Sequence, residues 1–221
     1  MRTLNYLAKT TILSLAAMSW FACAANDGGG ENGKVPDDKK QQKIADYFSG
    51  YLEGNTSLYD GKGPLRLSEI EAARAAVWEA WKKANIACQE EKLIELGPLS
   101  QGNSGRWNLP AKLEPNAVMP YYWGSKGETV PEGGFPLYIY THGSGPKDRE
   151  WANGLALCNG FDDAPSVYFI PQIPNEGNYY RWWQVAKQYA YEKLLRQAFV
   201  SGNIDPDRVY VFGISEGGYG S

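Results

Sequence analysis

The sequence predicts an α/β fold, in which helices flank a mostly parallel sheet, preceded by a short helical segment. Three apolar runs with the length of strands predict the sheet, and two amphipathic stretches between them predict the helices. The runs are residues 136–141, 166–170 and 209–212, and the helical stretches are 151–157 and 180–200. Strands that alternate with helices along a chain are typical of a parallel sheet covered on both faces.

The first 23 residues have the pattern of a signal peptide. Arg2 and Lys9 precede an apolar run over residues 11–21, and small residues surround Cys23. The run is shorter than a membrane-spanning helix requires. Ala22-Cys23 resembles the end of a lipobox. We therefore expect export, either as a periplasmic or cell-surface lipoprotein with its lipid on Cys23, or as a secreted protein.

Two segments are expected between this leader and the sheet. Residues 24–42 are rich in Gly, Asp and Lys and poor in apolar side chains, which predicts a flexible tether. Residues 43–100 are expected to form a helical amino-terminal segment. There, Ser68 and Glu71 have the spacing of a capping box, and apolar residues recur on one helical face. These residues are Ile70, Ala73, Val77 and Trp81.

Residues 101–221 are expected to form the α/β domain. Strand-like runs begin near Arg106 and recur over 118–123, and 129–134 predicts a turn, so the domain should open with antiparallel strands. Later, the stretch 180–200 has apolar residues on one side, and Gly202 is placed to end the helix. The residues on that side are Trp182, Val185, Ala186 and Tyr189.

The composition is that of a globular protein with no sign of a nucleic-acid partner. Apolar residues make up 43% of the chain, and the formal net charge of −3 lacks the basic excess of nucleic-acid-binding domains. If Cys23 carries a lipid, Cys88 and Cys158 remain. The sequence leaves open whether these two form a disulfide or stay as buried thiols.

The pentapeptide Gly-Ile-Ser-Glu-Gly at residues 213–217 has the pattern G-x-S-x-G and directly follows the predicted strand 209–212. In that context the pattern predicts a sharp strand-to-helix turn that exposes the Ser215 hydroxyl as a nucleophile. Gly213 and Gly217 leave room for the turn, because side chains there would collide with its strained backbone. The alternative is a chance turn in a chain that has 25 glycines.

A second motif, His142-Gly143-Ser144-Gly145, follows the predicted strand 136–141 and resembles an oxyanion loop. Acyl transfer through a serine creates a tetrahedral oxyanion, which is stabilised by N–H donors already in place. We expect one donor to be the backbone N–H of Glu216 and the other to come from Gly143 or Ser144.

His142 is the only histidine of the chain, and two roles are open for it. It is either the general base or a residue that orders the loop through hydrogen bonds. In enzymes with this elbow the triad follows the order Ser, acid, His, so the base comes after the nucleophile. His142 precedes Ser215, and we therefore expect the structural role.

Residues 204–218 read Ile-Asp-Pro-Asp-Arg-Val-Tyr-Val-Phe-Gly-Ile-Ser-Glu-Gly-Gly. They resemble the nucleophile region of α/β-hydrolase-fold serine esterases, in particular secreted polyhydroxybutyrate-depolymerase-like and feruloyl or acetyl-xylan esterases. With the motif at 141–145, the resemblance covers about residues 106–221. It implies cleavage of carboxylic esters, including polysaccharide-linked ones, through an acyl-enzyme on Ser215, with no metal or organic cofactor.

The chain departs from this family in one respect, since only six residues follow Ser215 and the triad acid and histidine are not among them. We therefore expect a carboxy-terminally truncated domain that hydrolyses activated esters at trace rates, with strand 209–212 as an exposed apolar edge. Two other functions stay open: a serine peptidase of the same fold, and a non-catalytic cell-surface binding protein.

Four residues follow the predicted strand 166–170 at its carboxyl end, where ligands bind in such sheets. They are Tyr179, Arg181, Trp182 and Trp183. Two roles are open for them. Arg181 and Trp182 are the candidates for substrate contact, and packing of a helix on the sheet is the alternative that we favour.

Overall fold

The computed structural model describes residues 38–55, 57–60, 64–174, 182–201 and 203–221. The chain divides into two compact units, the first ending at Gln89 and the second beginning at Glu90. The predicted signal peptide with Cys23 lies outside the described residues, and so do Tyr179, Arg181 and Gly202. Among the helices that are described, none is both long and apolar enough to cross a bilayer.

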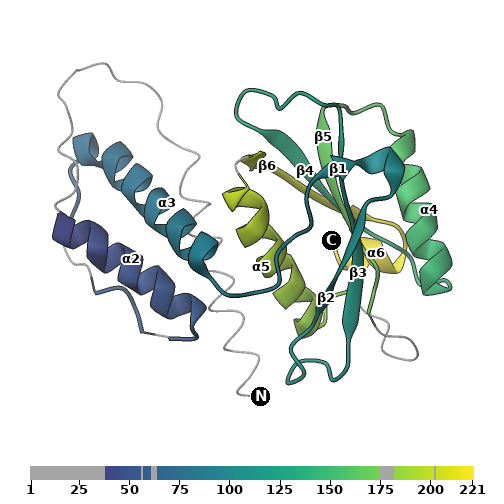
Figure 1. Cartoon of the computed structure of the whole chain (residues 1–221), viewed down its shortest axis with the longest axis horizontal. Coiled ribbons are helices and arrows are strands. Elements are labelled where there is room, and N and C mark those ends of the chain that lie inside the picture. The colour runs from purple at the N-terminus through teal and green to yellow at the C-terminus, as the bar shows by residue number, and fades with distance from the viewer. Residues whose placement is uncertain (1–37, 56, 61–63, 175–181, 202) are drawn as a thin grey trace. The chain divides into compact units, whose positions relative to one another are not determined.

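The first unit contains two helices that pack side by side, α2 (Asp38–Leu52) and α3 (Ile70–Ala87) (Figure 1). Helix α2 begins inside the segment 24–42, for which a flexible tether was expected. The helix buries Ile44, and Gln42 Nε2 donates a hydrogen bond to Asp46 Oδ1 at 2.7 Å. The buried Ile44 side chain and the hydrogen bond between two residues one turn apart stabilise a helix here over an extended tether.

The start of α3 also differs from the expected capping box. A 3-10 turn, η1 (Leu67–Glu69), precedes the helix, and the backbone N–H of Arg66 donates to the Glu69 carboxylate at 2.9 Å. Glu71 instead pairs with Arg74 at 2.9 Å. The expected pair of Ser68 and Glu71 is therefore wrong, because Glu69 takes the capping role two residues earlier.

The second unit is built on a six-stranded, mostly parallel sheet. Across the sheet the order is β1-β3-β5-β4-β6, and β2 pairs with β3. Strand β4 is parallel to β5 and β6, whereas β3 is antiparallel to β2 and β5, so the predicted α/β class is confirmed. The strands are β1 (Gly97–Pro98), β2 (Ser104–Asn108), β3 (Val118–Lys126), β4 (Phe135–Thr141), β5 (Ser166–Pro171) and β6 (Ile204–Gly213).

Two helices cover opposite faces of this sheet, α4 (Lys147–Gly160) and α5 (Val185–Val200) (Figure 1). Side chains alternate along β5. Tyr168 and Ile170 therefore pack with Cys158 of α4, while Phe169 faces the other way and stacks on Trp107. Both layers of the core consequently form around β5 and β4, whose side chains are buried on both faces.

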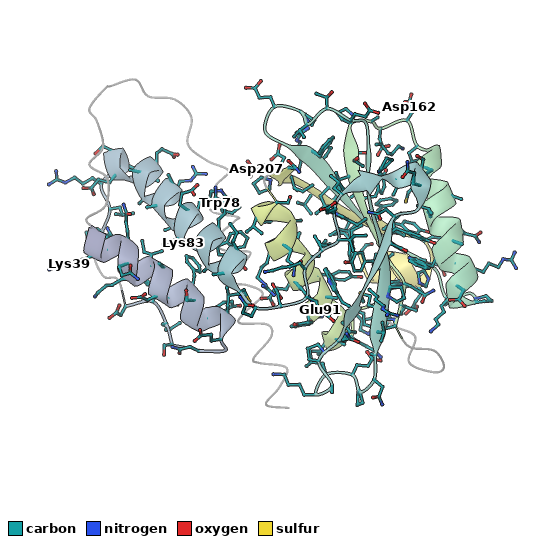
Figure 2. All side chains as sticks on the ribbon, in the orientation of Figure 1. Lys39, Trp78, Lys83, Glu91, Asp162 and Asp207 are labelled. Carbon is teal, nitrogen blue, oxygen red and sulfur yellow. The ribbon has the colours of Figure 1, made fainter. Side chains whose placement is uncertain are left out.

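Helix α5 is held by ion pairs, with carboxylates that precede it in the chain. Lys187 pairs with Glu114 at 2.8 Å, and Arg196 pairs with Glu90 at 2.8 Å. Lys193 lies 3.6 Å from Glu91, which is labelled in Figure 2, and 4.6 Å above the Trp107 ring. These contacts tie residues 90 and 91 to α5 and so to the second unit. The unit boundary therefore falls after Gln89, earlier than the expected boundary at residue 100.

Cys88 and Cys158 are both thiols in the structure. Cys158 is fully buried in the layer between α4 and the sheet, whereas Cys88 is half-buried. Burial raises the pKa of the Cys158 thiol to about 12. Since the thiolate is the reactive form, Cys158 acts as a small apolar core residue near neutral pH.

Candidate active site

The turn from β6 into the short helix α6 (Glu216–Tyr219) places Ser215 in a strained conformation. Its backbone has φ 53° and ψ −117°, and Asn116 is the only other non-glycine residue of the described chain with positive φ. Such conformations cost about 1–3 kcal/mol and persist only where surrounding contacts enforce them. Ser215 is exposed, so the turn presents its hydroxyl to solvent.

Hydrogen bonds on both sides of Ser215 enforce this turn. The Gly217 N–H donates to the Ile214 carbonyl oxygen at 2.9 Å, and the Gly218 N–H donates to the Ser215 carbonyl oxygen at 2.9 Å. The Ile214 N–H donates to the Thr141 carbonyl oxygen at 3.3 Å. The elbow is thereby fixed to the end of β4 as well as to itself.

Gly213 and Gly217 sit where no side chain fits. A Cβ on Gly217 would overlap the Thr141 carbonyl oxygen, and one on Gly213 would overlap the Thr141 hydroxyl. Thr141 is fully buried, and its Oγ1 donates to the Gly217 carbonyl oxygen at 2.7 Å. Both glycines are therefore required by the close approach of β4 to the elbow.

The loop after β4 lies against the elbow. Strands β4 and β6 are neighbours and run in the same direction, with Thr141 in register with Gly213. Their carboxyl ends meet at one edge of the sheet as a result. A Cβ placed on Gly143 would lie 3.7 Å from Ser215 Cβ and 3.5 Å from the Ile214 carbonyl oxygen. Two motifs far apart in the sequence are thus adjacent in space, and Ser144 is exposed beside them.

The His142 ring is fully buried and bonded at both nitrogens. Nε2 accepts the backbone N–H of Ile173 at 3.1 Å, and Nδ1 lies 2.7 Å from the Gly143 carbonyl oxygen. A carbonyl only accepts, so the proton is on Nδ1 and the ring is neutral. Burial lowers the pKa of His142, opposed by its bond to Gly143 and by the charge of Glu150. The ring therefore orders the loop and does not reach toward Ser215 as a base.

Trp182 lies in the turn before α5 and is fully buried. Its indole Nε1–H donates to the His142 carbonyl oxygen at 2.8 Å, and its ring meets the imidazole edge-to-face. The expected place of Trp182 on a helical face is wrong, because α5 begins only at Val185. Its neighbour Trp183 is 48% exposed.

The side chain of Glu150 in α4 lies against the loop at Gly143 and Gly145. A Cβ on Gly145 would lie 2.8 Å from the Glu150 Cδ, and one on Gly143 would lie 3.3 Å from its Oε2. The carboxylate therefore lies against the loop and explains the glycine at position 145. In the described residues no cluster of His, Cys, Asp and Glu is suited to hold a metal ion.

The structure brings together most of the residues predicted from the two motifs. Ser215, Glu216, Gly143 and Ser144 meet at one edge of the sheet, and Gly213 and Gly217 line the turn. Sequence reasoning missed the roles of Thr141, Glu150 and Ile173. Only Thr141 carried a signal, because a polar residue ends an otherwise apolar strand.

We compared the chain with protein-family models, with curated proteins and with solved structures, and none of the three comparisons gave a match.

Proposed function

We propose that the second unit is the nucleophile-bearing part of an α/β-hydrolase-fold serine esterase. The observation that carries the proposal is the exposed Ser215 at φ 53°, between a strand and a helix and next to Gly143. A strained serine at this position is the defining feature of the nucleophile elbow. A chance Gly-Ser-Gly turn has no reason to hold a serine in a costly conformation.

In the proposed reaction, Ser215 Oγ attacks the carbonyl carbon of an ester while its proton passes to a base. The carbonyl oxygen becomes an oxyanion, stabilised by the backbone N–H groups of Glu216 and of Gly143 or Ser144. Collapse of the intermediate releases the alcohol, which takes up a proton, and leaves an acyl group on Ser215. Water then hydrolyses this acyl-enzyme. The reaction needs no metal or organic cofactor.

These 221 residues do not supply the general base that the proposed reaction needs. His142 is their only histidine, and its ring is buried and bonded at both nitrogens. We therefore propose that the 221-residue chain acylates Ser215 slowly and turns over activated esters at trace rates. Export, with or without a lipid on Cys23, stays part of the proposal, as do polysaccharide-linked esters as substrates.

A fluorophosphonate probe followed by peptide mass spectrometry tests the proposal. We expect selective modification of Ser215, absent in Ser215→Ala and retained in Ser100→Ala, the matched control at an exposed serine outside the two motifs. Added imidazole should raise the rate in proportion to its concentration, because it supplies the missing base. Modification spread over several serines, or none at Ser215 even with imidazole, would exclude the esterase and favour a binding protein.

The leaving group that the chain releases distinguishes a peptidase from an esterase. With imidazole present, p-nitrophenyl acetate and a peptide p-nitroanilide are compared on the chain and on Ser215→Ala. We expect release of p-nitrophenol above the Ser215→Ala background and no release of p-nitroaniline. The reverse preference would replace the esterase with a serine peptidase of the same fold.

A further inference from the structure

The orientation of the loop at 142–145 is set by side chains that bind its carbonyl groups. The Trp182 indole donates to the His142 carbonyl oxygen at 2.8 Å, and the His142 imidazole donates to the Gly143 carbonyl oxygen at 2.7 Å. The donor sides are unambiguous, because an indole nitrogen only donates and a carbonyl oxygen only accepts. Two successive peptide groups are therefore each held by one ring.

Holding a carbonyl also directs the N–H of the same peptide. In a trans peptide the C=O and the following N–H point in opposite directions within one plane. The indole fixes the plane shared by the His142 carbonyl and the Gly143 N–H, and the imidazole fixes the next plane, which carries the Ser144 N–H. Both carbonyls are bonded to buried rings, so each N–H points away from the ring that holds the carbonyl of its own peptide, and Gly143 lies beside Ser215.

Trp182 is itself fixed by contacts on several sides. It packs with Ile173 and Tyr191, and Ile173 in turn donates its N–H to His142 Nε2. A Cβ on Gly220 would overlap the Trp182 Cβ, so the chain just after α6 rests on this residue. One buried side chain therefore contacts both the loop after β4 and the segment that follows the elbow.

We propose that Trp182 is a positioning residue that locks the His142–Gly143 peptide with its N–H toward the oxyanion. This inference rests on the proposed function of Ser215. Without the indole donor, the His142 carbonyl loses its buried partner and the peptide can turn over, which would point a carbonyl at the oxyanion. Stabilisation of the transition state falls, while binding of the ground state is little changed.

The test is the concentration dependence of fluorophosphonate labelling at Ser215, which separates the limiting rate from the half-saturating concentration. Trp182→Phe keeps an aromatic ring and removes the donor, and the exposed Trp183→Phe is the matched control. We expect Trp182→Phe to lower the limiting rate by about tenfold to a hundredfold, with the half-saturating concentration unchanged. Trp183→Phe should match the unsubstituted chain. A limiting rate unaltered in folded Trp182→Phe overturns the proposal.

Two further measurements keep the test decisive. If the unsubstituted chain does not label, the proposed function fails. The amide NMR signals of Gly143 and Ser144 then test separately whether Trp182 fixes the loop. Broadened or doubled signals in Trp182→Phe support the positioning role, and signals identical to those of Trp183→Phe overturn it. If Trp182→Phe does not fold, 3-benzothienylalanine at position 182 replaces it, since sulfur takes the place of the N–H in a ring of the same shape.

Discussion

The Thr141 hydroxyl donates a hydrogen bond to the Gly217 carbonyl oxygen at 2.7 Å, and this bond joins the end of β4 to the first turn of α6. Both residues are buried. The bond therefore lies in a medium where a lost partner is not replaced by water.

Thr141→Val removes this donor and keeps the shape of the side chain. We expect the free energy of unfolding to fall by about 0.5–1.5 kcal/mol, because the buried Gly217 carbonyl loses the Thr141 donor and keeps only the Gly220 N–H at 3.1 Å. Urea unfolding followed by circular dichroism measures the change. Thr129→Val is the matched control, since Thr129 is exposed, and should alter stability by less than about 0.5 kcal/mol. Equal effects of the two substitutions would contradict this account of the elbow.

Ser215→Gly should stabilise the chain while it removes the proposed nucleophile. Glycine adopts positive φ without the steric cost that serine has, although its unfolded state is more flexible. We expect a net gain of about 1 kcal/mol in the free energy of unfolding, measured in urea. Ser144→Gly, in the exposed neighbouring loop, should give no gain. A loss of stability in Ser215→Gly would mean that the turn at Ser215 is unstrained.

For the strands and the elbow, most of the observed features could be predicted from the sequence. The run 136–141 is apolar at successive positions because β4 is covered on both faces, and glycines at 213 and 217 mark the close approach to Thr141. Both signals are local, since they depend on burial and on steric room at the residue itself. Once they identify two parallel strands, the motifs that follow these strands are expected at the same edge of the sheet, although they lie 71 residues apart.

The role of Trp182 could not be predicted in the same way. Periodicity placed it on a helix, but the chain turns there and the helix begins at Val185. Its partner, the His142 carbonyl, lies 40 residues earlier, and no spacing rule encodes that contact. The unit boundary after Gln89 was missed for a similar reason, because the ion pair between Glu90 and Arg196 depends on tertiary packing.

Stability should depend on pH through His142. Burial lowers the pKa of His142 in the folded chain, whereas the unfolded chain regains a pKa of about 6.5. The unfolded state therefore binds more protons near and below that pH. The stabilising contribution of the neutral His142 is complete above about pH 6.5 and is lost as the pH falls from there toward the lowered pKa of the folded chain. Urea unfolding at a series of pH values measures this slope.

His142→Asn is the control for that measurement, because the chain has no other histidine. Burial raises the pKa of Glu192, and this group titrates in the opposite sense. The difference in slope between the chain and the variant isolates the histidine. Parallel curves between about pH 5.5 and 7.5 would show that His142 titrates normally in the folded state.

Strand β6 ends the sheet in the described part of the chain, and its Tyr210 and Val211 side chains are open to solvent. Val211 is 46% exposed, and an apolar edge of this kind is a template for pairing with another strand. We expect the chain to self-associate with rising concentration, measured by light scattering, and Val211→Lys to reduce this association. Val130→Lys is the matched control, because Val130 is 44% exposed but lies in a loop. Equal effects would locate the association elsewhere.

Lys187 and Lys193 of α5 are almost completely buried, each beside a carboxylate that precedes the helix in the chain. Removing an ammonium group from water costs several kcal/mol, so burying either lysine away from its carboxylate is strongly disfavoured. If α5 slid by one turn along the sheet, both charges would be separated from Glu91 and Glu114. Leucines in their place would tolerate such a shift. The two lysines thus give this helix a single permitted alignment.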